Sequence, residues 1–183
     1  DLAGFYFRAG DLEKARHNLR LRSSCQGSSD SQESVHADIL EGKIAHAQGR
    51  FAEASEIFLK VHQIAEKNKC VSALSNACIN LGNVMRDMGD YPSAYKHFTD
   101  ALKICEEIGI KESIAGIQVN LGNLSLSQGR LEDAFHHHQK SYVAFTEMGN
   151  VNGIALSQIN MAVASLEKGD AMRAVESAQS ALA

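Results

Sequence analysis

The stretch Asn80–Ala101, NLGNVMRDMGDYPSAYKHFTDA, decides the fold because its spacing recurs along the chain. Its centre is a glycine followed by a polar residue, a residue that is often bulky, two variable positions and an alanine, as in Gly89-Asp90-Tyr91 with Ala94. The same pattern begins at Gly10, Gly49, Gly129 and Gly169, so successive copies lie 39, 40, 40 and 40 positions apart. A repeat of this length indicates stacked supersecondary units.

Each copy predicts a helical hairpin. The glycine ends a first helix because it adopts the left-handed backbone conformation without steric cost. Apolar residues with helical period follow it, and Pro92 falls in the first turn, where a missing N–H costs nothing. Seven positions before each glycine stands a small residue that allows close helix packing. These residues are Ala3, Gly42, Gly82, Gly122 and Ala162.

The pattern predicts ten helices, with Ser23–Gln32 as the one low-complexity loop. The predicted helices cover 1–9, 11–22, 33–48, 51–67, 70–88, 91–108, 111–128, 131–148, 151–168 and 171–182. We interpret 1–183 as a single array, comprising a partial first repeat (1–22) and repeats at 33–68, 69–108, 109–148 and 149–183. The chain opens and ends inside helical patterns, so we expect it to be a piece of a longer protein.

Composition narrows the class of protein. Of 183 residues, 18 are Lys or Arg and 22 are Asp or Glu, and this net charge of −4 does not favour a nucleic-acid binder. No window reaches the ~20 apolar residues of a membrane-spanning helix, so we expect no membrane insertion. The four cysteines (Cys25, Cys70, Cys78 and Cys105) match no metal-binding spacing, and no secretory signal precedes them. We therefore expect free thiols and a cytoplasmic location.

Catalytic and cofactor motifs are absent from the sequence. It contains no Gly-rich phosphate loop, no nucleophile elbow and no HExxH motif. The triplet His136-His137-His138 lies on one predicted helix, where consecutive side chains diverge by about 100°. His138 stands 40 positions after Phe98, so we expect it to pack between helices rather than bind a metal. We expect no enzyme activity, no catalytic residues, no metal and no cofactor.

The residues Leu81-Gly82, Gly89, Tyr91, Ala94, Phe98 and Ala101 resemble the tetratricopeptide repeat (TPR) in type and spacing. The 40-residue period, the missing consensus proline and the recurring Asn-Leu-Gly-Asn are similar to the extended TPRs of Pins/LGN scaffolds. The resemblance implies an all-α fold. Its antiparallel helical hairpins would stack into a right-handed superhelix, an α-solenoid whose first helices line a concave groove.

Asparagines recur at the places that this architecture turns toward the groove. Asn80, Asn120 and Asn160 are 40 positions apart, and Asn83 and Asn123 follow the same interval. A carboxamide both donates and accepts hydrogen bonds, which suits a partner in extended conformation. The alternative is that these asparagines only tie neighbouring helices together. The predicted partner-binding residues are Lys43, Asn76, Asn80, Asn83, Arg86, Asn120, Asn123 and Asn160.

These observations favour a protein–protein interaction scaffold that binds an extended segment of another protein. Lys43 is the only basic residue at the places where chaperone-binding TPRs clamp a carboxylate, so an acidic chaperone tail is not the expected ligand. Two alternatives stay open. One is a structural spacer or an array that self-associates through exposed terminal repeats, and the other is a regulatory domain of a larger enzyme or ATPase.

Overall fold

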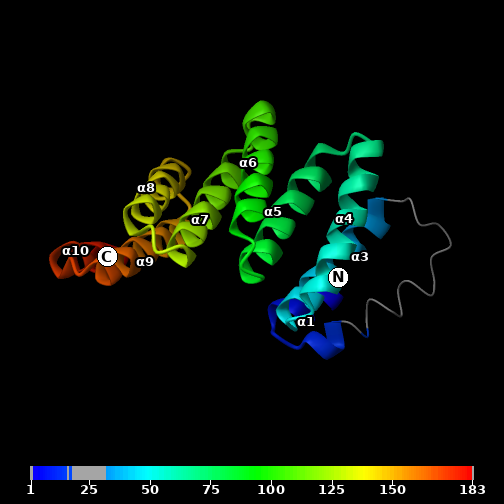
Figure 1. Ribbon diagram of the computed structural model, residues 1–183, viewed down its shortest axis with the longest axis horizontal. Helices are drawn as coiled ribbons and strands as arrows, with labels where there is room; N and C mark the ends of the chain where they lie inside the picture. Colours follow the sequence, from blue (N-terminus) through cyan, green and yellow to red (C-terminus); the bar gives the residue numbers. More distant parts are fainter. Residues whose placement is uncertain (1, 16, 18–31, 183) are drawn as a thin grey trace. The chain divides into compact units, whose positions relative to one another are not determined.

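The computed structural model describes residues 2–15, 17 and 32–182, which form helices joined by short connections (Figure 1). No strand occurs among these residues, and the all-α prediction is confirmed. The helices are α1 (Leu2–Arg8), α3 (Gln32–Ala47), α4 (Phe51–Lys67), α5 (Val71–Asp87), α6 (Tyr91–Ile108), α7 (Lys111–Ser127), α8 (Leu131–Glu147), α9 (Val151–Lys168) and α10 (Ala171–Leu182).

Each of these boundaries lies within one residue of its predicted position. The predicted helix 11–22 falls partly outside the described residues, and of the predicted loop Ser23–Gln32 only Gln32, the first residue of α3, is described.

Backbone conformation explains why the boundaries were predictable. The five pattern glycines all have positive φ, between 70° and 83°, as their helix-ending role requires. Three further left-handed residues end the second helices of the hairpins. They are Gly109, Gly149 and, with φ of 51°, Lys69. Asp90 and Asn150 cap the helices that follow, each accepting a hydrogen bond from the backbone N–H three residues on, at 3.2 and 3.0 Å.

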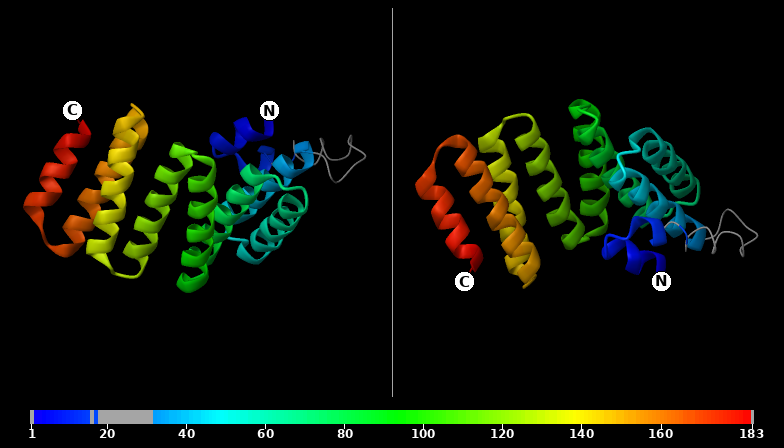
Figure 2. Two further views of the ribbon diagram at one scale, coloured as in Figure 1. Left: turned by 90° about the horizontal axis from the view of Figure 1, so that it is seen from above. Right: turned by 90° about the horizontal axis from the view of Figure 1, so that it is seen from below.

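The chain divides into two compact units, residues 1–88 and 89–183. In the first unit, α3, α4 and α5 pack on one another. In the second, the ribbon runs back and forth through α7, α8, α9 and α10, and each helix packs on the next (Figure 2). Antiparallel helices joined by short turns are thus the building block of both units.

The interior of the first unit is apolar. The fully buried Phe58 lies against Gly42, where a Cβ atom would come within 2.6 Å of the phenyl ring. Around it pack Ala45, Leu81 and Val84. The small residue at 42 therefore allows α3 and α4 to approach closely, as its position in the repeat predicts.

The interior of the second unit contains polar side chains at corresponding positions. His138 is fully buried against Gly122, and a Cβ atom at Gly122 would lie 2.4 Å from the imidazole ring. The prediction that His138 packs between helices is confirmed. Neither ring nitrogen has a hydrogen-bond partner among the described residues, and burial lowers the pKa of His138 to about 4. Between α8 and α9, the buried hydroxyls of Ser141 and Ser157 lie 2.6 Å apart.

Candidate binding surface

A pocket in the first unit brings together two of the predicted site residues, Lys43 of α3 and Asn76 of α5. Its volume is about 430 Å³, within the range of small-ligand sites. The side chains that line it come from α3, the end of α4, the turn that follows α4 and the start of α5. They are Val35, His36, Ile39, Lys43, Ile64, Ala65, Asn68, Cys70, Ser72, Ala73 and Asn76.

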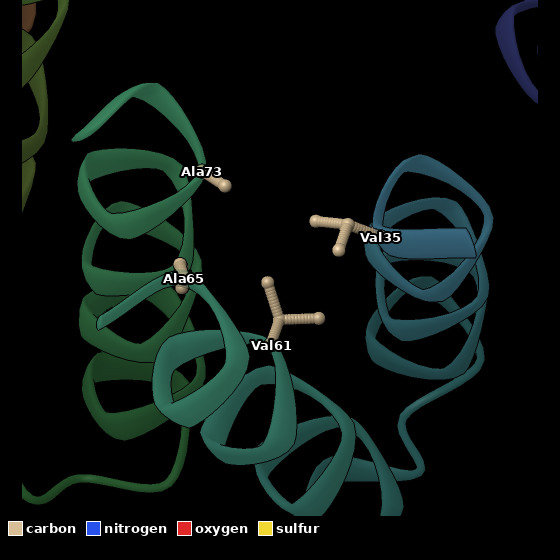
Figure 3. Packing of buried hydrophobic residues seen from close by; sticks show 5 residues of the cluster. Val35, Val61, Ala65 and Ala73 are labelled. Carbon is tan, nitrogen blue, oxygen red and sulfur yellow. The ribbon is translucent and has the colours of Figure 1, made fainter. Parts of the chain in front are cut away.

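The floor of this pocket is apolar and built from short side chains. Val35, Ala65 and Ala73 are buried and belong to one core cluster, against which Ile39 and Ile64 pack. Figure 3 shows Val35, Val61, Ala65 and Ala73 converging from α3, α4 and α5. Two alanines fill little of the space between three helices, which is why a pocket opens beside this core.

The rim of the pocket is polar and carries positive charge. Lys43 is half-buried, and its ammonium group makes no hydrogen bond or ion pair with any residue that the structure describes. Asn76 donates a hydrogen bond from Nδ2 to the backbone carbonyl of Ser72, at 3.0 Å, which leaves its Oδ1 available as an acceptor. None of the lining residues is acidic. The pocket therefore suits a ligand with an apolar group on the floor and an anionic or hydrogen-bonding group at the rim.

The other predicted residues of α5 differ in how accessible they are. Asn80 is only 9% exposed, and its Nδ2 donates to the backbone carbonyl of Asn76 at 2.7 Å. Asn83 is half-buried. The Arg86 guanidinium is paired with Asp87 at 2.9 Å, and the same carboxylate pairs with His46 of α3 at 2.8 Å. Arg86 is thus already engaged within the unit.

In the second unit the predicted asparagines lie on α7 and α9. Asn120, Asn123 and Asn160 are all half-buried, and their carboxamides make no hydrogen bond to the described part of the chain. Exposed apolar residues surround Asn160 on α9 at helical spacing, with Leu156 at 47% and Ile159 at 52% exposure. These side chains offer unused hydrogen-bonding groups beside apolar surface.

The sequence interpretation missed the apolar floor of the pocket in the first unit. A signal was present, because position 65 is alanine whereas position 145, which is 80 residues later, is phenylalanine. Comparing the two positions across repeats would have indicated missing volume in the earlier one.

The histidines and acidic residues form no metal site in the described ranges: no group of three or more His, Cys, Asp or Glu side chains is placed to hold an ion. His137 instead makes a 2.8 Å hydrogen bond to Gln118 of α7. Within the same ranges, no helix is long and apolar enough to cross a membrane.

Residues 36–107 match the tetratricopeptide repeat family. No curated protein matches the chain. Solved structures with the same fold are BtubC (BKLC) from P. vanneervenii, a Rap protein complexed with Competence and Sporulation Factor, and the Rap conjugation gene regulator of plasmid pLS20 in complex with the Phr* peptide.

The sequence identities to these structures are 18%, 12% and 17%, and the TM-scores are 0.79, 0.89 and 0.86. The alignments cover 98%, 98% and 99% of this chain. They cover 75% of BtubC but only 51% and 50% of the two Rap proteins. At such low identity the likeness establishes the fold, a TPR-type helical solenoid, and together with the family match it supports a TPR protein.

Proposed function

We propose that this TPR chain is a non-enzymatic scaffold that binds an extended segment of a partner protein. Each unit would contribute its own contacts, on α3 and α5 in the first unit and on α7 and α9 in the second. One observation carries the proposal: half-buried carboxamides recur at 40-residue intervals on α5, α7 and α9, and Asn83, Asn120, Asn123 and Asn160 use none of their hydrogen-bonding capacity within the described chain.

The chemistry of these groups suits a peptide backbone. A carboxamide accepts from a backbone N–H and donates to a backbone carbonyl, so a row of them satisfies an extended strand without reading its side chains. Asn80 fits the alternative role better, because it is buried and bonded to its own helix. We therefore assign partner contact chiefly to the other four.

The similar Rap structure with the bound Phr* peptide supports this class of ligand. The Asn-Leu-Gly-Asn recurrence resembles Pins/LGN-type scaffolds, and this resemblance supports an extended segment in particular. Cys70, Cys78 and Cys105 are free thiols, which is consistent with a reducing compartment such as the cytoplasm.

A peptide-display selection on the whole chain, followed by fluorescence-polarisation titration of the selected peptides, tests the proposal. Asn120→Ala and Asn160→Ala should each weaken binding roughly ten- to hundredfold, because each leaves a partner backbone group unpaired at a cost of about 1–3 kcal/mol. Gln139→Ala removes an exposed carboxamide from α8 and serves as the matched control, with affinity unchanged.

Thermal unfolding of the same variants distinguishes the alternative. If the asparagines serve the ligand, their replacement leaves the melting temperature within about a degree of the parent. Lower melting temperatures with unchanged affinity would assign these side chains to helix packing and favour the spacer function.

A further inference from the structure

We infer that the pocket between α3, α4 and α5 receives an aromatic side chain of the bound segment, and that an acidic group next to this side chain pairs with Lys43. This inference rests on the proposed function and specifies the ligand. Its basis is a difference between two places in the chain that are 80 positions apart.

The helices α3, α4 and α5 correspond in register to α7, α8 and α9. Under this shift Val35, Ile39 and Ala65 correspond to Ala115, Val119 and Phe145. In the second unit Phe145 is 6% exposed and packs against Ala115 and Val119. A phenyl ring of the chain itself therefore fills the place that corresponds to the pocket.

The fit of that ring is close. A Cβ atom added to Gly153 would lie 2.4 Å from Phe145, so the ring needs glycine on the facing helix. In the first unit the corresponding pair is Ala65 and Ala73. Alanine at 65 removes the ring, and the pocket of about 430 Å³ lies at this place. A ring supplied from outside would bury the apolar floor as Phe145 buries Ala115 and Val119.

The charge of Lys43 indicates which group of the ligand should lie next to the aromatic side chain. The residue that corresponds to Lys43 is the neutral Asn123, so the cation is particular to the open pocket. Lys43 is half-buried, has no acidic partner in the described chain and lines a rim without carboxylates. A carboxylate held beside the ring would form a charge-assisted hydrogen bond with its ammonium group.

The first test measures the pocket directly, with small probes and without a partner. Cys70 lines the pocket and is half-buried, whereas Cys78 and Cys105 are buried. In a Cys25→Ser background, the rate at which N-ethylmaleimide alkylates Cys70 is followed by mass spectrometry of the whole chain. We expect 3-phenylpropanoate to slow alkylation more strongly than 3-phenylpropan-1-ol, which lacks the charge, or propanoate, which lacks the ring.

Two variants test whether this protection arises from binding in the pocket. Ala65→Phe combined with Ala73→Gly transplants the Phe145–Gly153 pair into the first unit, and it should abolish protection by both phenyl probes. Lys43→Gln should remove only the advantage of the carboxylate over the alcohol. Circular dichroism and thermal unfolding establish that both variants fold. Equal protection in the parent and in the Ala65→Phe/Ala73→Gly variant (the filled variant) would overturn the inference. The absence of protection in the parent at saturating probe would also overturn it.

The second test uses the selected peptides. Peptides that bind the parent should contain an aromatic residue beside an acidic one, and replacing that aromatic residue by alanine should weaken binding about ten- to hundredfold in the parent but not in the filled variant. Peptides that bind through the asparagines yet tolerate this replacement would overturn the inference while leaving the proposed function intact. If the small probes protect Cys70 but no peptide is selected, the pocket is supported as an aromatic site and the proposed function fails.

Discussion

The three-helix stack α3–α4–α5 of the first unit and the stack α7–α8–α9 of the second have the same register but interiors of different chemistry. Four interior positions show the difference. The pairs, 80 positions apart, are Phe58 and His138, Val61 and Ser141, Ala65 and Phe145, and Ala77 and Ser157. All eight side chains are buried.

The two stacks share the shape of one interior contact and differ in the polarity of the side chains around it. Both stacks keep a ring on the second helix against a glycine on the first, in Phe58 with Gly42 and His138 with Gly122. The polarity of the ring and of its neighbours varies, because buried hydroxyls can find partners, as Ser141 and Ser157 do in each other and in the backbone carbonyls of His138 and Gly153. Shape complementarity between ring and glycine is therefore the constant, and polarity is the property that varies.

The largest expected difference between the stacks is pH sensitivity. The pKa of His138 is lowered by burial from 6.5 to about 4, so the unfolded chain takes up a proton below pH 6.5 that the folded chain refuses until pH 4. The contribution of His138 to the free energy of unfolding is therefore at its maximum above pH 6.5. It declines as the pH falls toward 4, by about 3 kcal/mol at about 1.4 kcal/mol per pKa unit. Urea unfolding monitored between pH 7 and 4 measures this loss.

The variant His138→Phe gives the second stack the ring of the first and serves as the control. It should remove that part of the pH dependence and raise stability at pH 7, because two unpaired ring nitrogens leave the interior. An unchanged pH profile in His138→Phe would show that the imidazole reaches water in the folded state.

The next largest effect concerns the contact of glycine with the ring. Gly122→Ala places a methyl group 2.4 Å from the His138 ring, and we expect a loss of about 1–3 kcal/mol from overpacking. Gly116→Ala on the same helix meets nothing within 4 Å and should instead add about 0.5–1 kcal/mol through helix propensity. Chemical denaturation of the two variants should shift the midpoint in opposite directions. Equal shifts would mean that α7 and α8 are less closely packed than the comparison requires.

The hydroxyl pair gives a smaller effect. Ser157→Ala reproduces Ala77 of the first unit and removes one partner of the 2.6 Å hydrogen bond, at a cost of about 1 kcal/mol. Ser141→Val together with Ser157→Ala reproduces the full apolar pair Val61 and Ala77, and it should recover most of that loss. A double-mutant cycle by thermal unfolding gives the coupling energy, and additive losses would contradict the proposed pairing.

The smallest effect concerns the turn before α5. Lys69 has φ of 51°, whereas the corresponding residues Gly109 and Gly149 adopt the left-handed region as glycines. Lys69→Gly should raise stability by a few tenths to about 1 kcal/mol, since it relieves a left-handed side chain at some entropic cost. Lys69→Ala retains the Cβ atom, so differential scanning calorimetry should detect no comparable gain in that control.

The sequence predicted the helices well because their ends depend on local chemistry. The left-handed glycines, Pro92 and the capping Asp90 and Asn150 act within a few residues, so spacing alone located the boundaries. The buried position of His138 followed from its alignment with Phe98, which is also a matter of register. Features that depend only on nearby residues and on register can be predicted from a single sequence.

The candidate site was less predictable, because exposure and pairing depend on neighbouring helices. Nothing in the sequence showed that Asp87 of α5 holds both Arg86 and His46, or that Asn80 would bond to its own helix. The pocket beside Lys43 lies where Ala65 of α4 replaces a ring, and it is enclosed by residues of α3 and α5 as well. Such a site becomes visible only when those segments are placed together or when equivalent repeats are compared.

The packing of each helix on its chain neighbour has a consequence for folding speed. Within each unit the described helices that pack most extensively on one another are consecutive in sequence, and α3 also contacts α5. Contacts are therefore short in sequence separation, little loop-closure entropy opposes them, and chains of this kind fold rapidly. An emerging polypeptide could complete one hairpin before the next leaves the ribosome, so that each finished hairpin serves as the template on which its successor docks.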